Sequence, residues 1–219
     1  MGDKNKTLPI IGERELRSFG MLDIDAQDDG STIEGHAAVY DQKTSIGGWF
    51  DEVIERGAFD ECNFDDVLFT ANHGMEKIPL ARSRRNNKSS TLQLATDEKG
   101  LKIRASLDRE NNADARALHS AVSRGDIDGM SMIMVVGEER WEDLDTNKPT
   151  RFVQKVKRIW DVSAVNFPAY RGTDIDARGQ AALDNAARVL ESARLTVETE
   201  KRSADQLEIE RLRHQILTK

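Results

Sequence analysis

The chain has 219 residues, of which 38% are hydrophobic and 32% charged, a balance typical of a globular domain with a well-solvated appendage. Acidic residues outnumber basic ones by 39 to 32, and the resulting net charge of −7 argues against non-specific nucleic-acid binding, which needs a basic surface. A single cysteine, Cys62, excludes an internal disulfide, and no apolar run approaches the roughly 18 residues of a membrane span. We therefore expect a protein of a reducing compartment without a secretion signal or a membrane segment.

The first 15 residues are polar, and we predict that they form a flexible N-terminus. Leu16–Ile24 and Thr32–Tyr40 are predicted strands, joined in a hairpin by the acidic, turn-rich segment 25–31. This segment also invites comparison with a calcium-binding EF-hand loop. No register of it supplies both the glycine at loop position 6 and the glutamate at position 12, so a solvated turn is favoured.

Residues 49–60 combine helical spacing with a glycine and predict a short helical turn. Val67–Thr70 is a short apolar strand that ends just before His73. Thr91–Ala95 and Leu101–Leu107 alternate between apolar and polar residues, which predicts a second hairpin.

The clearest helix before the tail is Asn111–Arg124, where an asparagine can cap the start and the following glycine can end the helix. Met130–Val136, Arg151–Val156 and Ile159–Phe167 are three further predicted strands. The fold class is therefore α+β, mainly β with flanking helices.

The composition changes near Gly179. Apolar residues then recur at helical spacing without glycine or proline, which predicts a long amphipathic helix or a helix pair. With 7 basic and 7 acidic residues this tail is neutral, so the rest of the chain carries the net charge of −7. We expect a main domain over 16–178 and a helical tail over 179–219 that docks on a partner.

Three side chains of different chemistry lie in or beside predicted apolar strands. His73 follows a strand, in a loop that a rigid element holds. Ser131 follows Gly129 at the start of a methionine-rich strand, where a buried hydroxyl needs a hydrogen-bond partner. Asp161 alternates onto the same face as Ser163, and a carboxylate on an apolar face must be paired. A base, a hydroxyl nucleophile and an orienting acid are the components of a serine hydrolase.

Each of these residues also has a purely structural explanation. A loop histidine is commonly a surface residue, a core serine commonly bonds to backbone, and Asp161 has Arg82 and Arg158 as possible ion-pair partners. Ser131 is not part of a G-x-S-x-G motif, which disfavours an α/β-hydrolase. The chain also lacks the paired His or Cys spacing of a metal-dependent hydrolase.

Seven ordered segments provide a more specific signal: Glu34–Tyr40, Glu52–Phe59, Asn72–Gly74, Pro79–Arg82, Gly100–Leu101, Gly129–Ser131 and Val162–Tyr170. In these segments, from about Arg17 to Arg178, the chain resembles the prohead protease family of tailed bacteriophages. The resemblance implies a fold related to the herpesvirus maturation proteases, a β-barrel with flanking helices.

The resemblance also implies roles for individual residues. Ser131 matches the nucleophile and His73 the base. Asp161 occupies a position at which phage members usually carry glutamate, and it is the favoured third member. The alternative is His36, because the herpesvirus relatives use a second histidine. Arg82, which follows an alanine where glycine is usual, and Arg171 are both candidates for assisting the oxyanion.

The implied function is that of a serine endopeptidase that forms an acyl-enzyme without a metal or cofactor. Its implied substrates are the scaffold or the scaffolding region of the major capsid protein, and the protease itself, inside the procapsid in the host cytoplasm. The relatives also suggest a homodimer, and self-cleavage near residues 172–205 would release the tail. The alternative is a catalytically inactive scaffold or interaction protein with the same fold.

Overall fold

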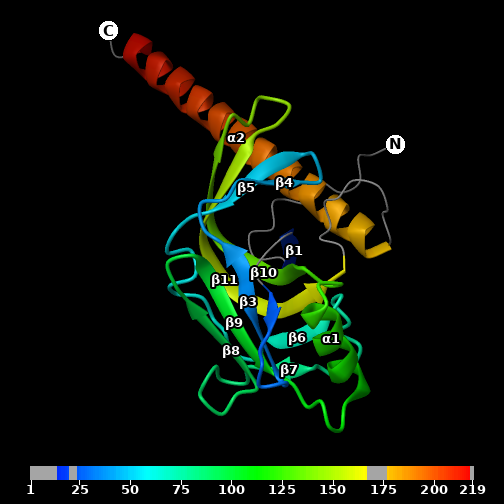
Figure 1. The fold of residues 1–219 in the computed structure, drawn as a ribbon. Coiled ribbons are helices and arrows are strands. Elements are labelled where there is room, and N and C mark those ends of the chain that lie inside the picture. The colour runs from blue at the N-terminus through cyan, green and yellow to red at the C-terminus, as the bar shows by residue number, and fades with distance from the viewer. Residues whose placement is uncertain (1–13, 20–23, 167–176, 218–219) are drawn as a thin grey trace.

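A long antiparallel hairpin, β10 (Gly129–Glu142) and β11 (Thr150–Val165), runs through the centre of the molecule (Figure 1). The structure is a computed structural model that describes residues 14–19, 24–166 and 177–217. The remaining strands are β1 (Arg14–Phe19), β2 (Asp25–Ala26), β3 (Thr32–Val39), β4 (Thr44–Ile46), β5 (Phe50–Ile54), β6 (Leu68–Ala71), β7 (Ala81–Arg82), β8 (Leu92–Thr96) and β9 (Gly100–Ser106). The helices are α1 (Ala113–Ser123) and α2 (Ala177–Leu217).

The hairpin belongs to a seven-stranded sheet with the order β1-β10-β11-β5-β4. One edge of β11 pairs in parallel with β5 over Thr150–Val153 and, farther along, with β6 over Asp161–Ala164. The β10–β11 register shifts at several points, and such irregularities bend and twist a strand pair. A bent β11 therefore reaches two different neighbours along a single edge.

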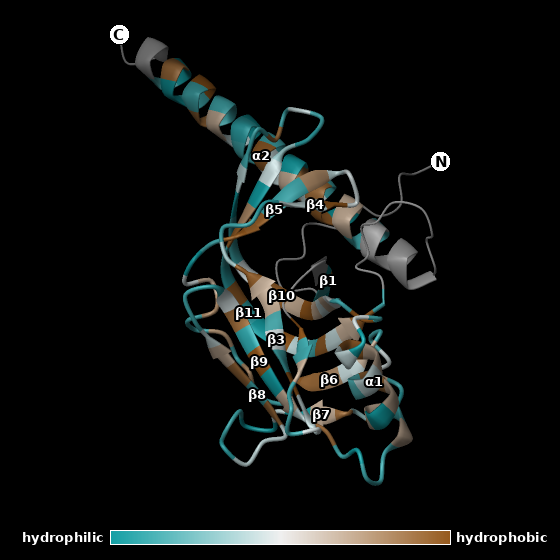
Figure 2. Cartoon of the chain, in the orientation of Figure 1, coloured by the Kyte–Doolittle hydropathy of each residue, from teal (hydrophilic) through white to brown (hydrophobic). Residues whose placement is uncertain are grey.

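The second sheet has the order β2-β3-β9-β8. Its inner face joins α1 and the central strands of the first sheet in one large apolar core. Figure 2 shows the hydrophobic residues of these strands in brown. The core contains fully buried Ile33 and Leu101 from the second sheet and Met132 and Val162 from the first. These strands pair into two open sheets in the described part of the chain, so the α+β class is confirmed but a closed barrel is not seen.

Two secondary-structure predictions are wrong. The predicted strand Leu16–Ile24 does not form the hairpin with Thr32–Tyr40, because β1 pairs with β10; the hairpin across the turn is the short β2–β3 pair, and β3 continues along β9. The predicted helical turn over residues 49–60 is instead β5 followed by turns, since Val53 and Ile54 pair in parallel with β11 and are buried there.

Other predictions are confirmed. The strands β8 and β9 form the expected hairpin, and α1 begins at the expected cap, with the Asn112 side chain accepting hydrogen bonds from two backbone amides of the first turn. Gly125 ends this helix with a positive φ of 74°. The two predicted strands over residues 151–167 are one continuous strand, β11.

The tail is a single 41-residue helix, α2, which begins slightly earlier than predicted. Ala186 and Leu190 pack against Ile46 and Phe50 in a second, smaller apolar cluster. Arg194 donates to the backbone carbonyl oxygens of the β10–β11 turn, at Leu144 (3.0 Å) and Thr146 (2.8 Å). Beyond this anchor the helix projects away from both sheets (Figure 1).

Candidate active site

Three neighbouring strands bring the predicted site residues together. In the β10–β11 pair Ser131 lies opposite Ser163, and Asp161 lies two residues before Ser163 on the same face of β11. On the other side of β11, Thr70 of β6 is the register partner of Ser163, and the chain reaches His73 directly after β6. Residues that are far apart in sequence thus meet at one end of the sheet.

The three predicted residues form a hydrogen-bonded chain. His73 Nε2 lies 2.5 Å from Ser131 Oγ, and His73 Nδ1 lies 2.6 Å from Asp161 Oδ2. Ser131 and Asp161 have no exposed surface, while 12% of the His73 side chain is exposed. In this geometry Asp161 orients the imidazole ring, and the opposite ring nitrogen is placed to take a proton from the hydroxyl.

The Asp161 carboxylate has further donors that compensate its burial. Thr70 Oγ1 lies 2.9 Å from Oδ1, and Ser163 donates its hydroxyl to Oδ2 at 2.7 Å. Ser163 Oγ also accepts the backbone N–H of His73 at 3.1 Å. A buried carboxylate is stable only when hydrogen-bonded and paired, so these two hydroxyls hold both the acid and the base in place.

The loop that carries His73 has an uncommon backbone conformation. Asn72 and His73 both have positive φ, 51° and 54°, which costs about 1–3 kcal/mol for a residue other than glycine. The Asn72 backbone N–H donates to the Ala164 carbonyl at 3.0 Å, and its side-chain Oδ1 accepts from the Asn166 N–H at 3.1 Å. These contacts with the end of β11 hold the loop in the conformation that points the imidazole at Ser131.

Ser131 has a second neighbour on its other side. Its Oγ lies 2.9 Å from the backbone carbonyl oxygen of Arg17 in β1, the strand that pairs with β10 at this point. The hydroxyl has one hydrogen and can donate it to either His73 Nε2 or the Arg17 carbonyl. If it donates to Arg17, His73 Nε2 must itself carry a proton to bond Ser131, and the ring is then unable to act as a base.

A buried ionic network anchors β1. Arg17 bonds Glu15 and, at 2.7 Å, Glu52 of β5, while Arg151 of β11 bonds Glu15 at 2.5 Å, Glu52 at 2.9 Å, and Glu139. Burial alone would raise the pKa of Glu15, but the charges and hydrogen bonds of Arg151 and Arg17 outweigh it and hold that pKa below its usual value of 4.5. The network ties four strands together beside the strand that contacts Ser131.

The remaining sequence candidates lie elsewhere. His36 Nε2 bonds the Asp97 carboxylate at 2.9 Å in the second sheet, so of the two candidates for the third member Asp161 contacts His73. Arg82 pairs with Asp66 at 3.2 Å at the start of β6, whereas His73 follows the end of that strand. The other oxyanion candidate, Arg171, lies outside the described residues. Burial raises the pKa of the Cys62 thiol to about 12, which makes a reactive thiolate unfavourable.

Sequence reasoning missed the supporting residues. Thr70 and Ser163 were visible as hydroxyls on predicted strands, and Ser163 shares the face of Asp161, but their partnership depends on the parallel β6–β11 pairing. The sequence did not indicate that Glu15 and Arg17 are buried, because alternating charges in a polar segment are normally exposed.

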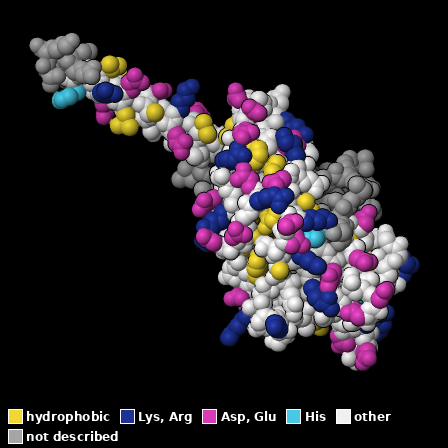
Figure 3. All heavy atoms as spheres, turned by 60° about the vertical axis from the view of Figure 1, so that its left-hand side comes forward, with side chains coloured by type: hydrophobic (Ala, Val, Ile, Leu, Met, Phe, Trp, Pro, Cys, Tyr) yellow, Lys and Arg dark blue, Asp and Glu magenta, His cyan; other side chains and the backbone are white. Residues whose placement is uncertain are grey.

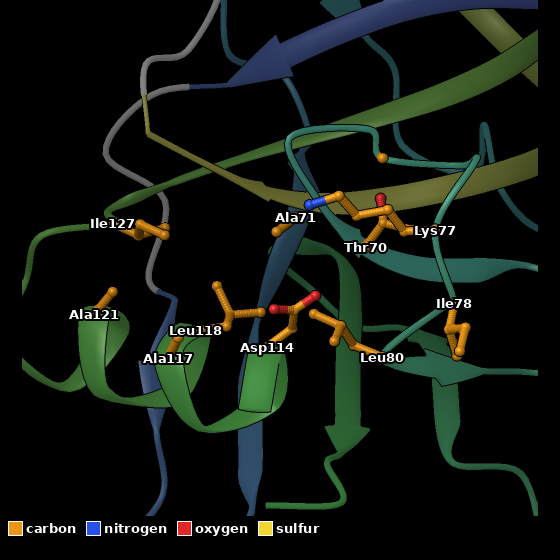
Figure 4. A pocket seen from close by; sticks show the side chains of 11 residues that line it. Thr70, Ala71, Lys77, Ile78, Leu80, Asp114, Ala117, Leu118, Ala121 and Ile127 are labelled. Carbon is orange, nitrogen blue, oxygen red and sulfur yellow. The ribbon is translucent and has the colours of Figure 1, made fainter. Parts of the chain in front are cut away.

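A cavity of about 270 Å³ lies beside the His73 loop (Figure 4). Thr70, Ala71 and Gly74 form one side of it, and α1 forms the opposite side with Ala117, Leu118 and Ala121. Ile127, which leads into β10, closes one end, while Ile78 and Leu80 line the other.

Comparisons with known proteins identify the family of the chain. Residues 21–187 match the family model described as caudovirus prohead serine protease. That match covers most of the chain. The chain belongs to this family. It is also 27% identical over 165 residues to the prohead protease of Enterobacteria phage HK97, an alignment that covers 73% of this chain and 66% of that relative, just under two thirds.

Among solved structures, the capsid assembly protease of bacteriophage T4 superposes with a TM-score of 0.40 at 14% identity, over 70% of this chain and 98% of that one. Neither described helix is long and apolar enough to cross a membrane. Within the described ranges, no group of three or more His, Cys, Asp or Glu residues is arranged to hold a metal ion.

Proposed function

We propose that this family member is a serine endopeptidase of phage capsid maturation, with Ser131 as nucleophile, His73 as base and Asp161 as the orienting acid. The observation that carries the proposal is the continuous hydrogen-bonded chain Ser131–His73–Asp161. These are the three residue types that an acyl-transfer mechanism needs, in the contact order that it needs.

The proposed mechanism starts with attack of Ser131 Oγ on a peptide carbonyl while His73 Nε2 takes the hydroxyl proton. Asp161, held by Thr70 and Ser163, stabilises the imidazolium and keeps its Nδ1–H oriented. The imidazolium then donates its proton to the leaving amine. Water, activated by the same histidine, hydrolyses the acyl-enzyme and regenerates the serine hydroxyl.

We further propose that the substrates are the scaffold or the scaffolding region of the major capsid protein, together with this chain itself, inside the procapsid. The family membership and the HK97 relative support this assignment. The outer half of α2 supports a docking role for the tail, because Leu207 and Leu212 expose more than half of their side chains to solvent. We also propose that the fold is related to that of the herpesvirus proteases and that the chain forms a homodimer.

The competing candidate is a catalytically inactive scaffold protein with the same fold. The site argues against it. A lone structural serine or histidine needs no partner of matching chemistry, whereas here a strained loop and two additional hydroxyls hold one imidazole between an acid and a serine.

The test is intact mass spectrometry of the full chain co-expressed with the major capsid protein of the same phage. Wild type and Ser106→Ala, an exposed serine of β9 that serves as matched control, are expected to yield the same defined fragments. Ser131→Ala is expected to yield intact chains only. Equal fragmentation with Ser131→Ala would refute the assigned nucleophile, and intact wild-type products in assembled procapsids would favour the inactive scaffold.

A further inference from the structure

We propose that the cavity between the His73 loop and α1 receives an aliphatic side chain of the cleaved peptide, close to the scissile bond. This inference rests on the proposed function and adds a substrate class to it. It follows from the position, the lining, the size and the charges of the cavity.

The position of the cavity connects it to both reacting groups. One wall is formed by Thr70, Ala71 and Gly74, which flank His73 in the sequence, and Thr70 itself bonds Asp161. One end is closed by Ile127, four residues before Ser131 on the segment that leads into β10. A peptide whose carbonyl lies at Ser131 Oγ thus has the cavity within reach of a side chain near the bond that breaks.

The lining selects for apolar groups. It is largely aliphatic and includes Ile78, Leu80, Ala117, Leu118, Ala121 and Ile127. Ala117 and Ala121 are one turn apart on α1, so their small side chains leave a groove along the helix surface (Figure 4). A volume of about 270 Å³ is below the roughly 300–1,000 Å³ of pockets for drug-sized ligands, and it suits a single large side chain.

Ile78 adds an independent observation. It exposes 83% of its surface although it forms part of the cavity wall. A single exposed apolar residue is common on protein surfaces, but this one borders an aliphatic cavity next to the proposed base. A substrate side chain in the cavity would cover it and gain apolar contact area.

The charged residues at the cavity do not favour a substrate side chain of either sign. Asp114 of α1 and Lys77 of the His73 loop both line it, and neither makes an ion pair with another described residue. A charged substrate side chain would meet one like and one opposite charge there. The aliphatic walls therefore determine which substrate side chain binds, and they favour Leu, Ile, Val or Met over polar residues.

The experiment uses the full chain and a library of peptides from a digested bacterial proteome with blocked termini. Mass spectrometry of newly formed termini identifies the residues on both sides of each cleaved bond. Wild type is expected to enrich Leu, Ile, Val or Met at one position within two residues of the bond. Ala117→Leu, which fills the groove, is expected to reduce that enrichment about tenfold or more and shift it to Ala and Gly, since one misfitting methylene in an apolar pocket is worth about 10–200-fold.

Ala113→Leu is the matched control, because Ala113 is an exposed alanine of the same helix outside the cavity. It is expected to keep the wild-type preference. Should Ala117→Leu fail to fold, Ile78→Ala removes a wall residue that is too exposed to support the core, with Trp49→Ala, an exposed apolar residue outside the cavity, as its control. Ile78→Ala is expected to lower kcat/KM several-fold for a peptide with Leu at the enriched position and to leave its Ala counterpart unchanged.

The outcomes separate the two proposals. Ser131-dependent cleavage without aliphatic enrichment, or with enrichment that survives both Ala117→Leu and Ile78→Ala, would overturn the assignment of the cavity alone. Cleavage that persists in Ser131→Ala, or its complete absence from wild type, would overturn the proposed function and the cavity assignment with it.

Discussion

At the scale of single residues, Ser131 has one hydrogen and, among the described residues, two acceptors within reach. His73 Nε2 is 2.5 Å away and the Arg17 carbonyl 2.9 Å away, and the serine has no exposed surface. The three residues of the proposed site are thus aligned in the hydrogen-bonded order that proton transfer from Ser131 to His73 needs.

Asp161→Asn is expected to lower kcat by about 10⁴-fold without unfolding the protein, since an amide of the same shape favours the wrong histidine tautomer, as in the chymotrypsin-type triad. Cleavage kinetics with a peptide from the enriched library set would measure this loss. Asp97→Asn is the matched control, because it alters the other histidine–aspartate pair of the described chain, at His36. Activity that falls equally in both variants would contradict the roles assigned here.

Ser163 acts through Asp161 and His73, so it is a positioning residue. Ser163→Ala is expected to lower kcat about 10–100-fold, because a hydrogen bond to a charged group is worth about 1.5–3 kcal/mol. Ser163→Thr retains the hydroxyl and is expected to recover part of the loss. A purely structural role would instead lower the free energy of unfolding and leave kcat of the folded fraction unchanged.

At the scale of elements, the sequence predicted what local patterns decide. The α1 helix has its cap at Asn112 and its stop at Gly125, and the β8–β9 hairpin alternates clearly, so both were found. The partner strand of β1 was not predicted. Arg14 pairs with Val135 far along the chain, and long-range packing decides such pairs. The site residues were found individually, partly by resemblance, but their contacts depend on the parallel β6–β11 pairing.

The buried network that anchors β1 makes its own prediction. Arg151→Met is expected to destabilise the fold by about 3–5 kcal/mol, because it leaves the buried carboxylates of Glu15 and Glu52 with Arg17 as their one remaining described cation. Urea denaturation would measure the change in the free energy of unfolding. Arg202→Met removes an exposed ion pair with Glu198 and is expected to cost no more than about 0.5 kcal/mol. Equal effects would mean that the network contributes no more than a surface pair.

The same network predicts a loss of stability in acid. The folded-state pKa of Glu15 is lowered, so the unfolded chain binds this proton first as the pH falls. The stabilisation is complete above the unfolded pKa near 4.5 and is lost as the pH falls through the folded value. Urea midpoints between pH 3 and 6 should therefore decline below about pH 4.5, and Glu15→Gln should flatten that decline while lowering stability at pH 6. An unchanged slope in Glu15→Gln would refute the assignment.

At the scale of the whole molecule, the described part of α2 combines a packed inner part and an exposed outer part in one continuous helix. Its inner part buries Ala186 and Leu190 against the sheet, while every described side chain from residue 196 to residue 214 is exposed. Figure 3 shows charges of both signs and apolar groups mixed along this projecting part. A 41-residue helix is about 60 Å long, so its outer half extends well beyond the two sheets.

Two truncations test the inner and the outer part of α2 separately. Removing residues 198–219 is expected to change the free energy of unfolding by no more than about 0.5 kcal/mol, because every side chain described in this range, from residue 198 to residue 214, is exposed. Removing residues 177–219 uncovers Ile46 and Phe50 and gives up the burial of Leu190, which alone is worth about 1.5–3 kcal/mol. Thermal and urea unfolding of both truncated chains beside the full chain would measure this difference. If the shorter deletion also destabilises the isolated protein, the outer part of the helix contributes to the stability of the fold. If the deletion leaves stability unchanged but abolishes cleavage in assembled procapsids, the exposed half of α2 binds a partner and does not stabilise the main domain.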